Sequence, residues 1–330
     1  MQERLNVVIL GKGRQAQFYK KIICKNKRLK ILNFKKKDYL LEDYSRKKID
    51  LFVIAEPTIY HFQILNYLLS KNFNILCEKP FCSNYRQAKK IFEKSKKYKH
   101  IFSLGYQFRF ESYVQFIKKL IDNNDLGKIR SVKVDWVTNH RAPHDKVHSF
   151  KNTKKYGGVF KEFACHVFDY CRWFFDKELL LKKYFAVNNI KYLRDKNNKL
   201  KKCDGYDYCE ILLRNNLDIN FYIKINNFGV KASHKIYIEG EKGFCSVIQN
   251  HPFRQKDIKI TYKIKNLDKT HYKNFSSFQD SRVLSTKKLL KKIIINILKK
   301  KDNLIPKFKD GLYIHKIIKN IHEKRNKSFS

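Results

Sequence analysis

The sequence predicts an α/β protein in which a doubly wound parallel sheet is followed by a second, α+β domain with a mostly antiparallel sheet. Three observations lead to this prediction. A glycine-rich turn at Gly11 joins an apolar run to a helical stretch, and strand-then-helix units repeat through residue 121. Strands alternating with helices favour a parallel sheet, whereas the succession of strands from residue 184 favours an antiparallel one. We therefore expect two domains, residues 1–122 and 123–330.

The first unit carries a motif for binding phosphate. Residues 5–10 are an apolar run typical of a strand, G-K-G-R-Q-A at 11–16 fits G-x-G-x-x-G/A, and a helical pattern follows to residue 24. In this context the first glycine makes the tight turn, the second admits a pyrophosphate, and the helix N-terminus faces its charge. We expect four residues here to contact a dinucleotide cofactor: Gly11, Gly13, Arg14 and Gln15. A glycine turn that binds no ligand is the alternative.

The second strand, residues 29–34, lacks the acid that usually holds the adenosine ribose about twenty residues past the glycines. Asn33 stands at this place, lysines follow at 35–37, and the first carboxylate is Asp38. Lysines here can bind a 2′-phosphate, so Asn33 and Lys35 are candidate cofactor contacts. The cofactor is then NAD or NADP, with NADP favoured. A basic turn whose lysines face water is the alternative.

The third unit places polar residues at the start of a helix. A strand at 49–55 ends before Pro57 and Thr58, and the helix that follows carries His61 early in its length. Because the carboxyl ends of parallel strands line the ligand crevice, we expect Pro57, Thr58 and His61 to lie on the cofactor side. A packing or capping histidine is the alternative for His61.

The fourth strand, residues 73–77, ends in Glu78-Lys79-Pro80. This sequence puts a charged pair at the edge where open α/β sheets bind ligands, and the proline fixes the backbone direction. We expect Glu78 to contact the cofactor and Lys79 to reach cofactor and substrate. A helix-capping turn with a solvated lysine is the alternative. Asn84 is expected to cap the next helix.

The fifth strand, residues 101–106, leads into Gln107 and Arg109 and then into an amphipathic helix at 114–121. We expect Gln107 to contact the cofactor. Tyr106 and Arg109 are expected to line the substrate crevice, where an arginine suits an acidic or phosphorylated group.

A loop after residue 137 carries three histidines. His140, His144 and His148 are four residues apart, which would suit a metal-binding helix. Pro143 interrupts that helix, and no carboxylate completes a set of ligands, so we expect no metal site. A loop that faces substrate or solvent is the preferred interpretation.

A helical run at 159–175 contains Glu162, His166 and Asp169. Neighbours among the three lie one helical turn apart. A carboxylate at this spacing can fix the tautomer of an imidazole and raise its basicity, which suits a general base. We expect His166 and Asp169 to contact substrate and Glu162 to act with His166. A structural histidine is the alternative.

The rest of the chain predicts an antiparallel sheet and two helices. The strand patterns occupy residues 184–190, 206–213, 218–225, 235–239 and 243–247. The first helix has an apolar face along residues 289–298, and its most apolar stretch, residues 293–298, is too short to span a bilayer. We expect it to dock on its own domain, with a membrane surface as the alternative.

The composition limits the choice of partners. The net charge is +43, but the basic residues are spread along the whole chain. Because Lys, Asn, Ile, Phe and Tyr have A/T-rich codons, a biased genome explains this profile, and a phosphate-rich partner is the alternative. No secretory pattern opens the chain, and its eight cysteines include no C-x-x-C pair. We expect a cytoplasmic protein with reduced thiols that binds neither membranes nor specific nucleic acid.

Several of these motifs together resemble those of the glucose–fructose oxidoreductase, inositol dehydrogenase and MocA (Gfo/Idh/MocA) family. The resemblance covers nearly the whole chain. It includes the glycine turn, Pro57-Thr58 with His61, Glu78-Lys79-Pro80, residues 105–110, and Gly157-Gly158 with Glu162 and His166.

The resemblance implies an N-terminal Rossmann domain and a second domain with an open-faced antiparallel sheet, through which such proteins form homo-oligomers, dimers or tetramers. It implies an NAD(P)-dependent oxidoreductase that acts on a sugar, a nucleotide sugar or a cyclitol. Lys79 and His166 correspond to the catalytic residues, and Glu162 stands where an aspartate is usual. Two other functions stay open: non-redox, nicotinamide-assisted glycoside cleavage, and a binding or scaffold role without catalysis.

Overall fold

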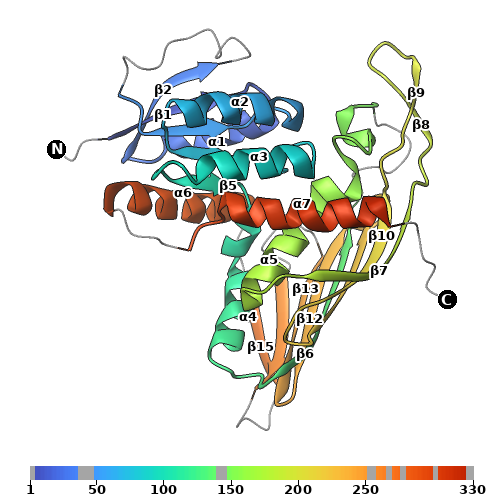
Figure 1. Cartoon of the computed structure of the whole chain (residues 1–330). Coiled ribbons are helices and arrows are strands. Elements are labelled where there is room, and N and C mark those ends of the chain that lie inside the picture. The colour runs from blue at the N-terminus through green and yellow to red at the C-terminus, as the bar shows by residue number, and fades with distance from the viewer. Residues whose placement is uncertain are drawn as a thin grey trace. The chain divides into compact units, whose positions relative to one another are not determined.

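The computed structural model (Figure 1) describes residues 4–35, 48–138, 147–250, 258–264, 270–275, 280–299 and 304–324. The chain divides into two compact units, one formed by residues 1–106 and 286–316 and the other by residues 107–285 and 317–330. Each unit combines two separate segments of the chain, whereas the sequence predicts one boundary, after residue 122. That boundary stays a prediction.

The first unit is built on a five-stranded parallel sheet with the order β2-β1-β3-β4-β5. Its strands are β1 (Leu5–Leu10), β2 (Leu29–Lys35), β3 (Leu51–Ile54), β4 (Ile75–Cys77) and β5 (Phe102–Leu104). β3 and β4 are buried along their whole length, as expected of strands covered on both faces. β2 and β3 flank β1 on opposite sides, so the topological switch point lies between β1 and β3. The predicted doubly wound sheet is confirmed.

Three helices connect these strands: α1 (Arg14–Cys24), α2 (Thr58–Ser70) and α3 (Tyr85–Ser95). α3 begins as the sequence predicts, because the side-chain oxygen of Asn84 accepts a hydrogen bond of 2.9 Å from the backbone N–H of Gln87.

A C-terminal segment also belongs to the first unit. The hydroxyl of Ser103 and the backbone N–H of Leu104, both in β5, donate to the carbonyl oxygen of Pro306 at 2.9 Å. Parts of the two long helices α6 (Ser281–Lys299) and α7 (Phe308–Glu323) belong to the same unit. The sequence pattern did not predict this return, because no local signal links residues so far apart in the chain.

The second unit is built on an eight-stranded sheet with the order β15-β14-β13-β12-β6-β11-β10-β7. The β6–β11 pair is parallel and the other neighbours are antiparallel, so the predicted, mostly antiparallel sheet is confirmed. The strands are β6 (Ile129–Val137), β7 (Leu180–Val187), β10 (Tyr208–Arg214), β11 (Asn220–Asn226), β12 (Ser233–Gly240), β13 (Gly243–Gln249), β14 (Ile258–Lys263) and β15 (His271–Phe275). Further elements are α4 (Ser112–Asp122), α5 (Cys165–Phe175) and a ribbon of β8 (Tyr192–Arg194) and β9 (Leu200–Lys202).

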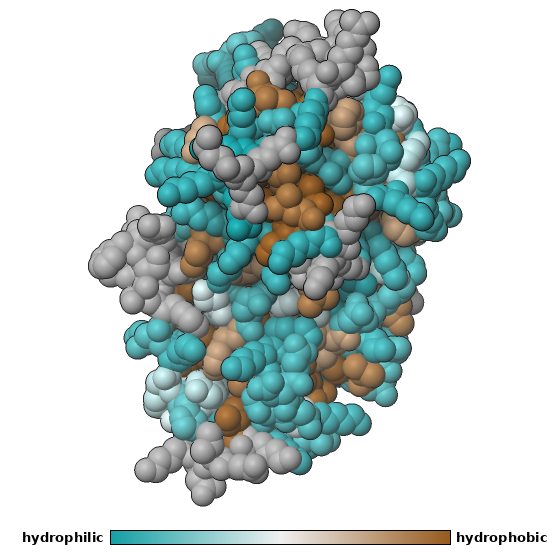
Figure 2. All heavy atoms as spheres, turned by 90° about the vertical axis from the view of Figure 1, so that its left-hand side faces the viewer, coloured by the Kyte–Doolittle hydropathy of each residue, from teal (hydrophilic) through white to brown (hydrophobic). Residues whose placement is uncertain are grey.

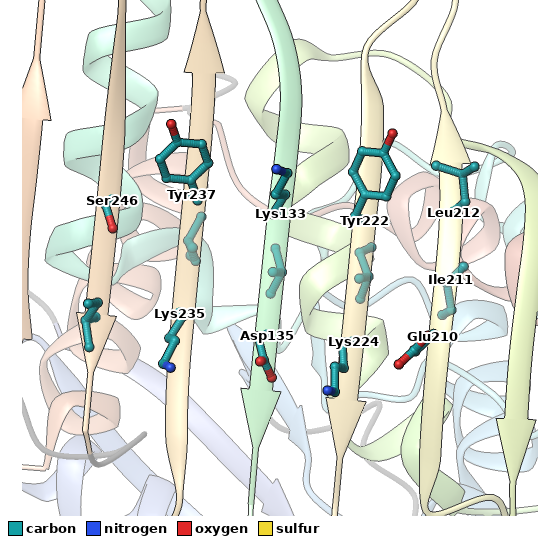
Figure 3. Close-up of a pocket in the computed structure, with 14 residues that line it drawn as sticks. Lys133, Asp135, Glu210, Ile211, Leu212, Tyr222, Lys224, Lys235, Tyr237 and Ser246 are labelled. Carbon is teal, nitrogen blue, oxygen red and sulfur yellow. The ribbon is translucent and has the colours of Figure 1, made fainter.

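The two faces of this sheet differ. On β6 the side chains of Val132, Val134 and Trp136 are buried. Those of Lys133 and Asp135, between them, lie on the open face (Figure 3). This open face contains a shallow cavity of about 380 Å³. Residues of five neighbouring strands line it, in the order β10, β11, β6, β12 and β13.

An aromatic cluster fills the covered face. The His234 ring, from β12, stacks on Trp136 with 4.5 Å between the ring centres. Its two nitrogens lie 3.2 and 3.1 Å from the hydroxyls of Tyr113 in α4 and Tyr170 in α5. The cluster therefore joins both helices to the sheet, and burial lowers the pKa of His234 to about 3.

Hydrophilic side chains cover most of the face seen in Figure 2, and apolar side chains form patches between them. Within the described parts of the chain, none of the helices combines the length and the apolar character that crossing a lipid bilayer requires.

The buried His234 makes the stability of the protein depend on pH. Its pKa is about 3 in the folded chain, whereas an unfolded histidine titrates near about 6.5. Between these values the unfolded chain binds more protons, so stability falls as the pH is lowered below about 6.5. The free energy of unfolding in urea should fall between pH 7 and pH 5 in the parent, and we expect this fall to be about 2 kcal/mol smaller in His234→Gln. An identical pH dependence in the two proteins would contradict this expectation.

Candidate functional site

Gly11 turns the chain out of β1 in a conformation that favours glycine. Its φ is +126°, and a Cβ at this position would lie 2.7 Å from the carbonyl oxygen of Ala55. The chain that leaves β3 therefore passes against the glycine loop with no room for a side chain.

Gly13 is the N-cap of α1, and its surroundings are open. Outside its immediate neighbours, no described atom lies within 4 Å of the place where a Cβ would stand, no side chain caps the helix, and its first turn contains no acid. Gly13 and Arg14 are both exposed. Backbone N–H groups at an uncapped helix start attract anions. This geometry fits the pyrophosphate of a dinucleotide.

The carboxylate of Glu78 is buried at the end of β4 and accepts three hydrogen bonds. Oε1 accepts from Gln15 Nε2 at 2.9 Å and from the Tyr19 hydroxyl at 2.7 Å, and Oε2 accepts from the backbone N–H of Lys79 at 3.1 Å. A Cβ on Gly105 would lie 2.9 Å from the carboxyl carbon. The sequence predicts Gln15 and Glu78 as cofactor contacts, and the structure joins these two side chains to each other.

Burial and the neighbouring groups change the pKa of Glu78 in opposite directions. Burial raises its pKa, whereas the hydrogen bond from Tyr19, the charge of Lys79 and the hydrogen bond from Gln15 lower it. Burial, and then the charge of Glu78, raise the pKa of Tyr19 well above its usual value. The phenol therefore keeps its proton and acts as a permanent donor to the carboxylate.

His61 braces the same turn from α2. Its Nδ1 lies 2.9 Å from the carbonyl oxygen of Pro80 and its Nε2 lies 2.8 Å from that of Glu56, with 1% of the residue exposed. The Lys79–Pro80 peptide bond is cis. Burial lowers the pKa of His61, and the contacts with the carbonyls raise it. His61 thus holds the turn against the start of α2, and its predicted cofactor contact stays a prediction.

Other predicted residues occupy the ends of elements. Pro57 is the N-cap of α2 and Thr58 is its first residue. Tyr106 is buried, and Gln107 begins the short 3-10 helix η2 (Gln107–Phe110). Their roles toward cofactor or substrate stay predictions.

Some predicted residues lie outside the described ones: the side chains of Asn33 and Lys35, and all of Lys36, Lys37, Asp38, His140 and His144. His148 is described, and its Nε2 lies 3.2 Å from the carbonyl oxygen of Lys202. In the described part of the chain, no cluster of His, Cys, Asp or Glu side chains could hold a metal ion.

The predicted helix over residues 159–175 is not regular. A π-helical turn, η4 (Phe160–Ala164), precedes α5, which begins at Cys165. Glu162 lies in the π turn and His166 in the α-helix. The predicted α-helical spacing between them is therefore wrong, because a π turn holds more residues than an α turn. Such turns occur often at functional sites.

Glu162 and His166 have partners that the sequence did not indicate. The Glu162 carboxylate lies 3.7 Å from Lys151 Nζ and accepts a hydrogen bond of 3.4 Å from the Asn227 side chain. His166 is 3% exposed, and its ring centre lies 4.6 Å from that of Phe108. The aromatic cluster thus continues to the candidate catalytic histidine.

Arg109 and Asp169 form a buried ion pair. Nε and one terminal nitrogen of Arg109 donate to the two carboxylate oxygens at 2.7 and 2.6 Å, and the side chains are 4% and 1% exposed. The sequence predicts both residues as substrate contacts. In the structure these donors and acceptors face each other, which fixes α5, and with it His166, relative to η2.

Two family models match the chain. The model described as the NAD-binding Rossmann fold of an oxidoreductase family matches residues 4–106. The model described as the C-terminal alpha/beta domain of the same oxidoreductase family matches residues 118–328.

The chain is similar to curated proteins over part of their length. Glucose-6-phosphate 3-dehydrogenase of Bacillus subtilis is 27% identical over 194 residues, which cover 58% of this chain and 55% of that protein. 2,7-Anhydro-N-acetylneuraminate hydratase of Mediterraneibacter gnavus is 27% identical over 86 residues, 26% of this chain and 23% of that protein. The chain thus spans about half the length of the first relative and less of the second.

Solved structures share the fold across the chain. Levoglucosan dehydrogenase in complex with NADH has a TM-score of 0.81 at 16% identity, over 97% of this chain and 96% of that chain. A super-repressor mutant of Gal80p from Saccharomyces cerevisiae has a TM-score of 0.85 at 14% identity, over 97% of this chain and 95% of that chain. At such identities the likeness concerns the fold alone.

Removing one member of the Arg109–Asp169 pair deprives the other buried charge of the two hydrogen bonds that join them. We expect Asp169→Asn and Arg109→Met each to lower the free energy of unfolding by about 3–5 kcal/mol in urea. The double variant Arg109→Met/Asp169→Leu should lose less than half of the sum of the two single losses in free energy of unfolding, because neither charge of the pair is then buried.

The matched control is the exposed pair Lys319–Glu323. Glu323→Gln should change the free energy of unfolding by no more than about 0.5 kcal/mol. Losses of less than about 1 kcal/mol in both single variants of the buried pair would contradict the assignment.

Proposed function

The chain belongs to the Gfo/Idh/MocA oxidoreductase family, and we propose that it transfers hydride between a nicotinamide cofactor and a CH–OH group of a sugar, a nucleotide sugar or a cyclitol. The observation that carries this proposal is the braced turn at Glu78 and Lys79, which is hydrogen-bonded to the helix of the glycine loop. A lysine fixed at the carboxyl edge of the sheet suits a ligand in the crevice there. The similarity to a sugar-phosphate dehydrogenase supports the same class of substrate.

The first unit offers the groups that a dinucleotide needs. Gly11 and Gly13 leave space for the pyrophosphate, and the start of α1 favours its charge. When bound, the nicotinamide accepts or donates the hydride. The cofactor is NAD or NADP, and Lys35 favours NADP through its positive charge. Further proposed cofactor contacts are Arg14, Gln15, Asn33, Pro57, Thr58, His61, Glu78, Lys79 and Gln107.

The chain's own residues divide the work on the substrate. In the oxidative direction, the His166 imidazole takes the proton of the hydroxyl group as hydride leaves the same carbon. The Lys79 ammonium donates a hydrogen bond to that oxygen and stabilises its developing charge. Glu162, held by Lys151 and Asn227, supports His166.

An anionic sugar is the favoured kind of substrate. A net charge of +43 draws anions toward the molecule. The Bacillus subtilis relative carries a phosphorylated sugar in its name. Arg109, whose guanidinium is hydrogen-bonded to Asp169, stays a proposed contact of the anionic group.

Non-redox chemistry is the second candidate function, and the similarity to a hydratase favours it. In such a reaction a hydride that leaves the substrate returns to it within one turnover. The two candidates differ in one measurement, because only a dehydrogenase changes the amount of NADH or NADPH at 340 nm as substrate is consumed.

The first test of the proposed function is a fluorescence titration of the protein with NADH and with NADPH at moderate salt. Tight binding of one of them is expected, and binding of neither would overturn the proposal. Turnover is then screened with glucose 6-phosphate, levoglucosan, myo-inositol and nucleotide sugars.

We expect Lys79→Met and His166→Asn each to lower kcat by about a thousandfold, because each removes a group that acts on the reacting oxygen. The dissociation constant for the dinucleotide should stay within about threefold. Lys89→Met, which removes an exposed lysine of α3, is the control and should retain the parental kcat. Parental turnover in either site variant would remove that residue from the mechanism.

We also propose that a second copy of the chain covers the open face of the eight-stranded sheet. One row across four strands reads Glu210, Lys224, Asp135, Lys235, with opposite charges facing each other in register (Figure 3). One carboxylate oxygen of Asp135 is buried without a hydrogen-bond partner among the described residues. Alternating charges of this kind are self-complementary across a two-fold axis.

Light scattering after size exclusion tests this assembly. The parent should have a mass that is a multiple of 39.8 kDa. Tyr222→Lys/Tyr237→Lys should give the single-chain mass, because the two new lysines flank Lys133 in register and place three like charges side by side on the contact face. Tyr192→Lys, on the exposed β8–β9 ribbon, is the control. A parent that elutes as a single chain would overturn the proposal.

A further inference from the structure

Tyr19 belongs to neither motif of the first unit, yet it connects them: the glycine loop at residues 11–16 and the turn Glu78-Lys79-Pro80. It lies on α1 four residues after Gln15, and only 1% of it is exposed. At this spacing both side chains leave the same face of the helix. Both donate to the same oxygen of Glu78, Tyr19 at 2.7 Å and Gln15 at 2.9 Å.

The carboxylate that receives these hydrogen bonds has little freedom to move. Its second oxygen accepts the backbone N–H of Lys79 at 3.1 Å. On the side of β5, a Cβ on Gly105 would lie 2.9 Å from the carboxyl carbon, so the carboxylate already fills the space that glycine leaves. The positions of the carboxylate and of the Lys79 backbone are therefore coupled.

A phenol suits the position of Tyr19. Its hydroxyl gives a charge-assisted hydrogen bond to the carboxylate. It brings no charge of its own, whereas a lysine or arginine would compete with Lys79 for the negative charge of Glu78. Burial and the charge of Glu78 raise the pKa of Tyr19, so the proton stays on the phenol.

We propose that Tyr19 is a positioning residue for the proposed reaction, and that it holds the Glu78 carboxylate in the orientation that fixes the backbone of Lys79. This inference rests on the proposed function, because Tyr19 acts through Lys79. The same hydrogen bonds tie the Lys79 turn to the helix that begins at the glycine loop, so cofactor loop and lysine are kept in one arrangement.

The test is Tyr19→Phe in the full-length protein, with Tyr184→Phe as the matched control. Both variants remove the hydroxyl of a buried tyrosine, but the Tyr184 hydroxyl donates to the backbone carbonyl of Lys324, a neutral acceptor. The first readout needs no substrate. Hydrogen–deuterium exchange of the Lys79 amide, followed by mass spectrometry, should be about tenfold faster in Tyr19→Phe and parental in Tyr184→Phe.

The second readout is the separate measurement of kcat and KM with glucose 6-phosphate and the preferred dinucleotide. Because a displaced Lys79 stabilises the developing charge on the reacting oxygen less well, kcat should fall about tenfold in Tyr19→Phe, with KM changed less than about threefold. Gln15→Met removes only the other donor and should change both readouts in the same direction by less. It gives the same test if Tyr19→Phe folds poorly.

Faster exchange at Lys79 together with a lowered kcat supports the proposal. Parental exchange at Lys79, or a parental kcat in Tyr19→Phe, overturns it. If the parent turns over no substrate of the screen while Tyr19→Phe still speeds exchange at Lys79, the coupling stands and the proposed reaction is what fails.

Discussion

A carboxylate can stay buried in a protein only if hydrogen bonds replace the water that it has lost. Glu78 meets this condition with donors from two sources: Gln15 and Tyr19 on α1, and the N–H of Lys79 in its own turn. Satisfying one buried charge thus joins the helix of the glycine loop to the turn that carries Lys79. Gly105 belongs to the same constraint, because any side chain there would displace the carboxylate. The edge of the sheet is organised by this group before any ligand arrives.

The second unit relies on a charged pair in a comparable way. Arg109 and Asp169 meet through two parallel hydrogen bonds, a geometry that tolerates less displacement than apolar packing does. Asp169 lies on α5 three residues after His166, so the pair limits the movement of the helix that carries the candidate base. Arg109 belongs to η2, and the ring of Phe108, also in η2, packs on His166. Each unit therefore places its candidate catalytic residue next to a buried, hydrogen-bonded carboxylate.

The sequence indicates those parts of this design that are local. The strands of the parallel sheet, the glycine turn and the Asn84 cap each depend on residues a few positions apart, and periodicity and turn chemistry reveal them. The partners of the site residues depend on distant contacts: Tyr19 and Glu78 are 59 residues apart, and Arg109 and Asp169 are 60 apart. The sequence did not predict the π turn at Glu162, because the residues of this turn have the pattern of an ordinary α-helix. The spacing of Gln15 and Tyr19 on one helix face was the signal that could have found the Glu78 network.

The basic composition bears on assembly as well as on substrate. The chain has 73 Lys and Arg against 30 Asp and Glu, so two copies repel each other over most of their surfaces. Codon bias would place lysines without regard to acids, yet Glu210 and Asp135 alternate with Lys224 and Lys235 along one row of the open sheet. In that row the charges balance. A balanced row is where two strongly basic molecules can meet with less of the repulsion that the rest of the surface imposes, and this favours the open sheet as the place of contact.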